Sequence, residues 1–270
     1  MSLDITAVKL PGNSFQSLLD NAKKEQTMKL IFIRHGDPDY DIDSLTERGW
    51  VEAELLSEKM KNVKADKIYV SPLGRAKDTA KVSLEKMNMT ATELPWLKEF
   101  EPRIIRPDQP DRKNVSWDWL PEDFAVCDEF FSPDTWLTHP VFDGTDVRSE
   151  IKSIYQSFEE LLNSHGYKKD GRLFRAVRAN NDTIVFFCHF AITCVLLGYL
   201  LNMSPMVLWH GLCAAPTSVT TVNTEERREG IAYFRMASYG DISHLYAGNM
   251  EPSFAARFCE CYMNEDERHD

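Results

Sequence analysis

The sequence predicts an α/β fold in which helices flank a mostly parallel central sheet. Two continuous apolar runs, at residues 30–33 and 184–188, are typical of parallel strands that are buried on both faces. Segments with apolar residues at helical spacing alternate with these runs and with shorter apolar segments, which is the pattern of an α/β protein. The 270 residues are also enough for one large domain with a well-developed core.

The first hundred residues supply strands and helices in alternation. Thr46 has the position of an N-cap, and the helix expected after it carries Trp50, Ala53, Leu56 and Met60 at the spacing of one buried face. The expected elements are strands at 29–34, 66–70 and 91–94 and helices at 47–60 and 75–87. Residues 1–27 fit the pattern poorly, and the sequence leaves open whether they dock on the domain or form a lead that the fold does not need. The domain itself is expected to span residues 28–270.

Residues 101–145 lack a regular period and are rich in proline. So long a stretch is either functional or disordered, and its many aromatic residues favour packed structure. We therefore expect an inserted, aromatic-rich cap that covers the functional site. Its aromatic residues include Trp117, Trp119, Phe124, Phe130, Phe131 and Trp136.

The second half of the chain returns to regular structure. The apolar run at 184–201 could be taken for a membrane span, but His189 and Gly198 interrupt it and no basic cluster flanks it. A buried strand followed by a core helix explains it better. The expected elements are helices at 145–164 and 190–202 and strands at 183–188, 216–223 and 231–236, with a charged turn at 225–230.

Composition narrows the class of protein. A formal net charge of −11 argues against general binding to nucleic acid or to anionic membranes, although a local electropositive pocket can still attract a small anion. The six cysteines form no C-x-x-C pair, which favours a reduced, cytoplasmic chain with buried thiols over a disulfide framework. No basic stretch followed by an apolar stretch opens the sequence, so we expect no secretory signal.

Arginine and histidine residues follow three of the expected strands. Arg34 and His35 end the first strand, Arg75 follows the strand at 66–70, and His189 follows the strand at 183–188. Ligands of open α/β sheets bind beyond the carboxyl ends of the strands, so these side chains are expected to converge. Gly36 allows a sharp turn that brings main-chain N–H groups close to an anion. Two guanidinium and two imidazole groups would suit a dianionic phosphoryl group, because the planar fork of arginine engages two oxygen atoms at once.

As an ordered set, several motifs in residues 29–245 resemble those of the histidine phosphatase (phosphoglycerate mutase-like) superfamily. The motifs are Arg34-His35-Gly36, Leu45-Thr-Glu-Arg-Gly49, Ser71-Pro-Leu-Gly-Arg75-Ala-Lys-Asp-Thr79, Leu97-Lys-Glu99, the late His189, and Asp241-Ile-Ser-His244-Leu245. No single motif is specific, but their order is. The resemblance implies a phosphoglycerate mutase-like fold.

The resemblance also implies roles for five of these residues. His35 would be the nucleophile and become phosphorylated, while Arg34, Arg75 and His189 would hold the phosphoryl oxygens. Glu99 would protonate the leaving oxygen and then activate water, so that His35, Glu99 and His189 form the catalytic set. The arginines disfavour protonation of His35 and stabilise charge on the equatorial oxygens. No metal or other cofactor is required in this scheme.

Two assignments are less constrained. Glu101 lies two residues after Glu99 and would point the same way on an extended segment, although Leu97-Lys-Glu99 matches the family spacing better. The Gly-His-Gly neighbourhood that is usual in the family is replaced by Cys188-His189-Phe190, which is expected to narrow the pocket. Candidate substrate-selecting residues are Asp37, Glu101 and Arg103, and the insertion adds Arg106, Arg112, Trp117 and Trp119.

The sequence therefore predicts a metal-independent phosphomonoester hydrolase that acts through phosphohistidine on a small phosphorylated metabolite and releases inorganic phosphate. Two alternatives remain open. A phosphoglycerate mutase would transfer the phosphoryl group instead of hydrolysing it, but the insertion shows no mutase pattern. A sensor of phosphorylated ligands would bind without turnover, but the complete set of site residues argues against it.

Overall fold

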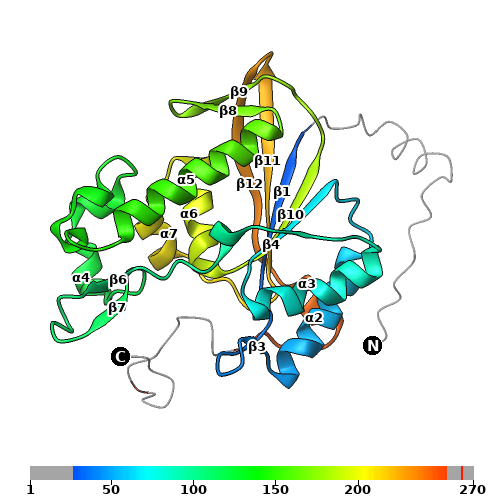
Figure 1. Cartoon of the computed structure of the whole chain (residues 1–270), viewed down its shortest axis with the longest axis horizontal. Helices are drawn as coiled ribbons and strands as arrows, with labels where there is room; N and C mark the ends of the chain where they lie inside the picture. Colours follow the sequence, from blue (N-terminus) through cyan, green and yellow to red (C-terminus); the bar gives the residue numbers. More distant parts are fainter. Residues whose placement is uncertain (1–26, 254–262, 264–270) are drawn as a thin grey trace, which may run out of the picture.

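The computed structural model describes residues 27–253 and residue 263, and its centre is an eight-stranded mixed sheet with helices on both faces (Figure 1). The expected fold class is therefore confirmed. Residues 1–26, about which the sequence left two readings open, lie outside the described residues, as do Cys259 and Cys261.

The sheet has a parallel half and an antiparallel half. Strands β5, β4, β10 and β1 run parallel in that order, and β11, β12, β9 and β8 continue the sheet as antiparallel neighbours. Arg34 is paired with Cys188 between β1 and β10, and Phe187 with Val70 between β10 and β4, so these strands end at one edge. The strands of the sheet are β1 (Lys29–Arg34), β4 (Lys67–Val70), β5 (Thr92–Glu93), β8 (Tyr167–Asp170), β9 (Leu173–Ala176), β10 (Thr183–Cys188), β11 (Val219–Arg228) and β12 (Ile231–Asp241).

Alternation along the central strands divides the core into two clusters. Phe32 and Phe186 stack on each other (ring centroids 5.0 Å apart) and face α5 (Val147–Ser164) and α6 (Phe190–Leu201). Ile33 and Phe187 point to the opposite face, toward α2 (Glu47–Met60) and α3 (Gly74–Met87). Figure 1 shows the two helix pairs on opposite sides of the sheet. Since both faces are covered, the central strands are continuously apolar, as the sequence indicates.

Several local predictions are also confirmed. The Thr46 side chain accepts a hydrogen bond from Gly49 N (3.0 Å) and caps α2. The run at 184–201 is strand β10 followed by the buried helix α6, which begins directly after His189. In the part of the chain that the structure describes, no helix has the length and apolar character to cross a membrane. Cys188 and Cys194 are buried thiols.

The stretch at 101–145 is packed, as its aromatic content predicts. Trp136 is buried edge-on against Trp209 (5.8 Å between ring centroids), and Phe100 stacks on the same Trp209 (5.4 Å). Trp209 belongs to α7 (Pro205–Gly211), so the insertion is fastened to the α5–α7 side of the sheet. Its elements are β6 (Arg103–Ile105), β7 (Lys113–Val115), α4 (Pro121–Ala125) and short 3₁₀ turns at Asp128–Phe131, Trp136–Thr138 and Pro140–Phe142.

The structure differs from the sequence-based predictions at a few places. Trp50 is 38% exposed and does not share the buried face of α2. The expected charged turn at 225–230 is mostly strand, because the backbone of β11 stays paired with β12 as far as Arg228 opposite Ile231, and only a tight turn at Gly230 remains. The side chain of Glu225 also forms an ion pair with Arg235 (2.7 Å) across the two strands. The remaining unpredicted elements are the β8–β9 hairpin, α7, the small ladder of β2 (Pro38–Asp39) and β3 (Ser44–Leu45), α8 (Ser243–Ala247) and the turn Pro95–Leu97.

Candidate active site

The carboxyl ends of β1, β4 and β10 bring the two predicted histidines together. His35 N donates to Cys188 O (3.0 Å), and Ser71 N donates to Phe187 O (2.9 Å), so the chain is still tethered to its neighbours where each strand ends. The imidazole rings of His35 and His189 have centroids 5.1 Å apart and planes inclined by 56°. Residues 154 positions apart in sequence are thus neighbours at one sheet edge.

His35 is held as a neutral ring with one nitrogen available. Its Nδ1 lies 2.7 Å from Gly36 O, and because a carbonyl can only accept, Nδ1 carries the hydrogen. Nε2 therefore keeps its lone pair. Burial, reinforced by the charge of Arg34, lowers the pKa of His35 well below its usual value. A Cβ at Gly36 would lie 2.8 Å from Gly49 O, so this close turn requires glycine.

The two predicted arginines are buried and lie close enough to act electrostatically on both histidines. Arg34 donates through Nη1 to Ala214 O. Arg75 donates through Nη1 to Asp43 Oδ1 (2.7 Å), while Asp43 Oδ2 accepts from Gly74 N (2.6 Å). The Nε of Arg75 is buried and has no hydrogen-bond partner among residues 27–253. Arg75 is thus fixed on one side and retains an unused donor.

Asp43 is a residue of the candidate site that the sequence did not single out, and it contacts the predicted site residue Arg75. It is the last of four alternating aspartates in the loop after Gly36, and nothing in the spacing distinguishes it from the other three. Its left-handed backbone (φ 48°) turns the carboxylate toward the start of α3. The Tyr40 ring from the same loop lies 5.4 Å from Arg75 Cζ, so the loop contacts that guanidinium twice.

His189 is completely buried, and its two nitrogens differ. Nε2 lies 2.7 Å from the hydroxyl of Ser71, the residue that follows β4. Nδ1 is buried without a partner in the described part of the chain. Burial lowers the pKa of His189 well below its usual value, and the neighbouring His35 and the arginines add to the effect. The second imidazole is therefore neutral as well.

The carboxylate of Glu99 lies at the N-terminus of α6, the helix that begins directly after His189. Its Oε1 accepts from Phe100 N (2.9 Å) and from Ile192 N (3.0 Å). Burial raises the pKa of the carboxyl group, although these N–H groups and Arg34 oppose the shift. Since Oε1 already accepts two hydrogen bonds, a proton on this group belongs on Oε2. Glu101, the rival acid, is exposed.

The three candidate substrate-selecting residues do not lie together with the histidines and arginines in a common cluster. Both carboxylate oxygens of Asp37 are already in use, because they accept hydrogen bonds from Thr46 Oγ1 (2.7 Å) and from Ser253 Oγ (2.6 Å). Glu101 and Arg103 are exposed at the start of the insertion. Within the insertion, Arg106 is buried in an ion pair with Asp108 (2.6 Å), which makes it a structural residue of the cap.

Aromatic side chains limit the space beside the arginine and histidine cluster. The Phe190 ring lies 6.0 Å from Arg34 Cζ, and Trp117 meets Phe190 edge-on (6.2 Å between centroids). Trp117 also donates through Nε1 to Phe100 O (2.8 Å), the carbonyl that follows Glu99. The insertion therefore reaches the region of the candidate site through Trp117.

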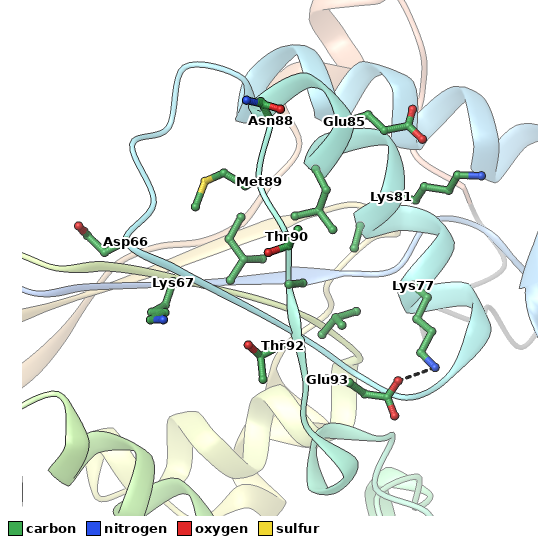
Figure 2. A pocket seen from close by; sticks show the side chains of 15 residues that line it. Asp66, Lys67, Lys77, Lys81, Glu85, Asn88, Met89, Thr90, Thr92 and Glu93 are labelled. Atoms are coloured by element: carbon green, nitrogen blue, oxygen red, sulfur yellow. Dashed lines mark ion pairs between the residues drawn. The ribbon is translucent and has the colours of Figure 1, made fainter.

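The surface pocket in Figure 2 is a separate feature. It lies between α3, strand β4 and the edge strand β5, and labelled side chains such as Lys77 and Glu93, which form an ion pair (2.7 Å), line it. None of the predicted site residues lines this pocket. In residues 27–253, moreover, no group of three or more His, Cys, Asp or Glu side chains is placed to hold a metal ion.

Comparisons with known proteins agree with this geometry. Residues 30–110 match the model of the histidine phosphatase superfamily (branch 1). A phosphoserine phosphatase from Entamoeba histolytica is 22% identical, with 81% of this chain and 99% of that chain covered and a TM-score of 0.51. A mycobacterial glucosyl-3-phosphoglycerate phosphatase is 17% identical, with 79% and 99% covered and a TM-score of 0.53.

A putative α-ribazole-5′-P phosphatase from Escherichia coli is 18% identical, with 79% and 97% covered and a TM-score of 0.50. No curated protein sequence gives a significant match. At these identities, the solved structures establish the fold, while the family model covers the segment that carries Arg34, His35, Arg75 and Glu99. The family resemblance that the sequence motifs predict is thereby confirmed: this chain has the fold and, over residues 30–110, the sequence signature of the histidine phosphatase superfamily.

Proposed function

We propose that the protein is a metal-independent phosphomonoester hydrolase that acts through a phosphohistidine at His35 on a small phosphorylated metabolite. The observation that carries this proposal is the neutral His35 ring, with Nδ1 committed to Gly36 O and Nε2 open, beside His189 and within the field of two buried arginines. Such a ring is a nucleophile in a site built for anionic oxygens.

In the first step, the Nε2 lone pair of His35 forms a bond to phosphorus as the bond from phosphorus to the leaving oxygen breaks. Glu99 gives its Oε2 proton to that oxygen, and an alcohol departs. Arg34 and Arg75 stabilise the charge on the equatorial oxygens. The raised pKa of Glu99 keeps the acid form available, while the lowered pKa of His35 keeps the nucleophile unprotonated.

In the second step, the Glu99 carboxylate takes a proton from water while the water oxygen forms a bond to phosphorus. The bond between phosphorus and His35 Nε2 breaks, and its electron pair returns to the ring. Inorganic phosphate leaves, and both His35 and Glu99 regain their starting protonation states. The cycle consumes one ester and one water molecule and needs no redox partner.

The substrate class is suggested by the structural neighbours. The phosphoserine phosphatase from Entamoeba histolytica is bound to phosphoserine in one structure and to 3-phosphoglyceric acid in another, and a mycobacterial neighbour is a glucosyl-3-phosphoglycerate phosphatase. These are small phosphorylated molecules, which fits a site whose surroundings are crowded by Phe190 and Trp117. The proposal is therefore limited to small phosphomonoesters.

The test is a comparison of His35→Asn with the wild-type chain on a panel of phosphorylated metabolites and on nitrophenyl phosphate without added metal. Asparagine can still donate to Gly36 O, so the fold should be retained while hydrolysis is lost. Rapid acid-free quenching should trap phosphohistidine in the wild type only. His139→Asn, on the insertion, is the matched control and should keep activity.

Phosphatase activity that persists in His35→Asn would overturn the nucleophile assignment. A phosphohistidine that resists water and passes its phosphoryl group to a second metabolite would replace hydrolysis by transfer.

A further inference from the structure

The Ser71 hydroxyl occupies a constrained position beside His189. Ser71 is fully buried at the first position after β4, and its N–H is tied to Phe187 O on the neighbouring strand (2.9 Å). Its Oγ lies 2.7 Å from His189 Nε2 and accepts a hydrogen bond from Leu73 N (3.2 Å). Parallel pairing of β4 with β10 sets the distance between the two side chains, because Val70 and Phe187 are opposite each other.

Counting donors and acceptors distinguishes the two neutral forms of His189. If Nε2 carried the hydrogen, Ser71 Oγ would accept from both His189 and Leu73, and its own hydrogen would be buried without an acceptor among the described residues. If Nε2 is bare, the hydroxyl accepts once and donates once, and both of its functions are used. Buried polar groups are rarely left unsatisfied, so the second arrangement is favoured.

We propose that Ser71 is a positioning residue whose hydroxyl donates to His189 Nε2 and holds that ring as the Nδ1–H tautomer, with the N–H directed to a phosphoryl oxygen. This inference rests on the proposed phosphohydrolase function for its consequence, though not for the tautomer itself. Within the His189 ring, Nδ1 is the nitrogen that is buried without a hydrogen-bond partner among residues 27–253. An anion would supply the acceptor that is missing there.

The proposal explains how two neutral imidazoles of one site take opposite roles. At His35, the Nδ1 hydrogen is used by Gly36 O, and the remaining lone pair on Nε2 can attack phosphorus. At His189, the Nε2 lone pair is used by Ser71, and the remaining Nδ1–H can donate. A bare Nδ1 at His189 would instead present a lone pair to anionic oxygens and repel them. The carbonyl of Gly36 thus leaves His35 as the nucleophile, and the hydroxyl of Ser71 leaves His189 as the hydrogen-bond donor.

The tautomer can be measured directly on the complete chain. Long-range ¹H–¹⁵N spectra of histidine-labelled protein, phosphate-free and at neutral pH, distinguish a ring nitrogen that carries hydrogen from a bare one. The His189 signals are assigned by their loss in His189→Gln. We expect hydrogen on Nδ1 and a bare Nε2 in the wild type. A hydrogen on Nε2, whether in a neutral or a charged ring, overturns the proposal without reference to any activity.

Variants test the consequence. Ser71→Ala should give His189 as a mixture of tautomers and lower both kcat/KM and the affinity for orthovanadate about 10-fold to 100-fold, because a donor to the phosphoryl oxygens is no longer held in place. Ser71→Thr, which restores a hydroxyl, should recover part of the loss. Ser83→Ala is the matched control, since Ser83 is also a buried serine, on α3, whose hydroxyl has no partner in the described residues. It should leave tautomer and kinetics unchanged.

The outcomes separate the two proposals. A Ser71→Ala protein that keeps the wild-type tautomer and vanadate affinity overturns the role of Ser71, even if His35→Asn abolishes hydrolysis. A wild-type chain without phosphatase activity overturns the proposed function, while the spectra and vanadate binding still decide on Ser71. If Ser71→Ala does not fold, Ser71→Cys, with a weaker donor, supplies the comparison.

Discussion

Glu99 and Glu101 show how surroundings separate two residues of the same type. Both carboxylates follow the turn Pro95–Leu97, and spacing alone left their roles open. Glu99 reaches the first turn of α6, where Ile192 N binds one of its oxygens, whereas Glu101 faces solvent. The backbone N–H groups fix the orientation of the carboxylate, and burial keeps its proton accessible at a higher pH.

Glu99→Gln should therefore discriminate between leaving groups. An alkyl alkoxide needs a proton to depart, whereas nitrophenolate does not, so we expect kcat for alkyl phosphates to fall by about 10²-fold to 10⁴-fold and kcat for nitrophenyl phosphate to fall much less. Steady-state kinetics on both substrate types measure the difference. Glu101→Gln is the matched control and should affect neither. Equal losses on both substrates in Glu99→Gln would assign the acid role to another group.

The expected pH dependence of the reaction follows from the raised pKa of Glu99 and the lowered pKa of His35. Burial raises the pKa of Glu99 from 4.5, so its acid form persists above that pH. Burial and Arg34 lower the pKa of His35 well below 6.5, so its neutral form persists in mild acid. We expect kcat/KM for an alkyl phosphate to be highest in mildly acidic solution and to fall as the pH rises through the Glu99 pKa. Because nitrophenyl phosphate needs no acid, a parallel fall for it would contradict this assignment.

At the scale of elements, the sequence is informative where a strong period coincides with burial. Strands β1 and β10 and helices α2, α3 and α6 follow from continuous or helical apolar patterns, and their order places His35 and His189 at one edge. The β8–β9 hairpin and the outer part of β11 could not be predicted, because polar residues there are held by pairing across strands, as in Glu225 with Arg235. The periodic spacing of apolar residues carries no information on such cross-strand pairs of polar side chains.

The contact of Asp43 with Arg75 could not be predicted from the sequence either. It joins residues 32 positions apart through a left-handed residue in an irregular loop, and neither composition nor spacing distinguishes Asp43 from Asp39 or Asp41. The convergence of the histidines and arginines could be predicted, because topology alone produces it. The residues that orient them depend on exact backbone paths, which the sequence does not reveal.

Gly74 is the point where this loop meets α3. A Cβ there would lie 2.0 Å from Asp43 O, so Gly74→Ala must separate the loop from the helix and disturb both hydrogen bonds of Asp43. We expect a loss of about 1–3 kcal/mol in the free energy of unfolding and weaker orthovanadate binding, because Arg75 loses its anchor. Urea unfolding and vanadate titration measure the two effects.

Gly211→Ala provides the matched control, since a Cβ at this helical glycine meets no atom within 4 Å. Its unfolding free energy should change by less than about 0.5 kcal/mol. If Gly74→Ala binds vanadate as tightly as Gly211→Ala does, the Asp43 contact does not position Arg75.

At the scale of the whole molecule, the two halves of the sheet have different tasks. The parallel half delivers Arg34, His35, Ser71 and His189 to one edge. The antiparallel half closes the opposite side of β1, where Arg34 N donates to Ser218 O and Thr217 N to His35 O. His35 is thus held by hydrogen bonds to both neighbouring strands, and buried histidines that are neutral in the folded chain lie around it.

At His244, which the candidate site does not include, the effect of a buried neutral histidine on the free energy of unfolding can be measured. It is buried at the start of α8, with Nε2 3.0 Å from Thr217 Oγ1, and burial lowers its pKa to about 4. The unfolded chain, with a histidine pKa near 6.5, binds a proton that the folded form excludes. The stabilising effect of a neutral His244 is thus complete above pH 6.5 and is lost as the pH falls toward 4.

In His244→Gln, this proton uptake disappears. The free energy of unfolding should therefore fall less steeply between pH 6.5 and pH 4.5 than it does in the wild type, by a slope that corresponds to about one proton fewer taken up on unfolding. Urea unfolding at a series of pH values measures both slopes under the same conditions, so the carboxyl groups contribute equally to each and cancel. His35 and His189, which are buried and neutral too, continue to bind protons on unfolding and leave a residual slope in the variant. Identical slopes in the two proteins would mean that His244 binds protons equally in the folded and the unfolded chain, so that burial does not lower its pKa.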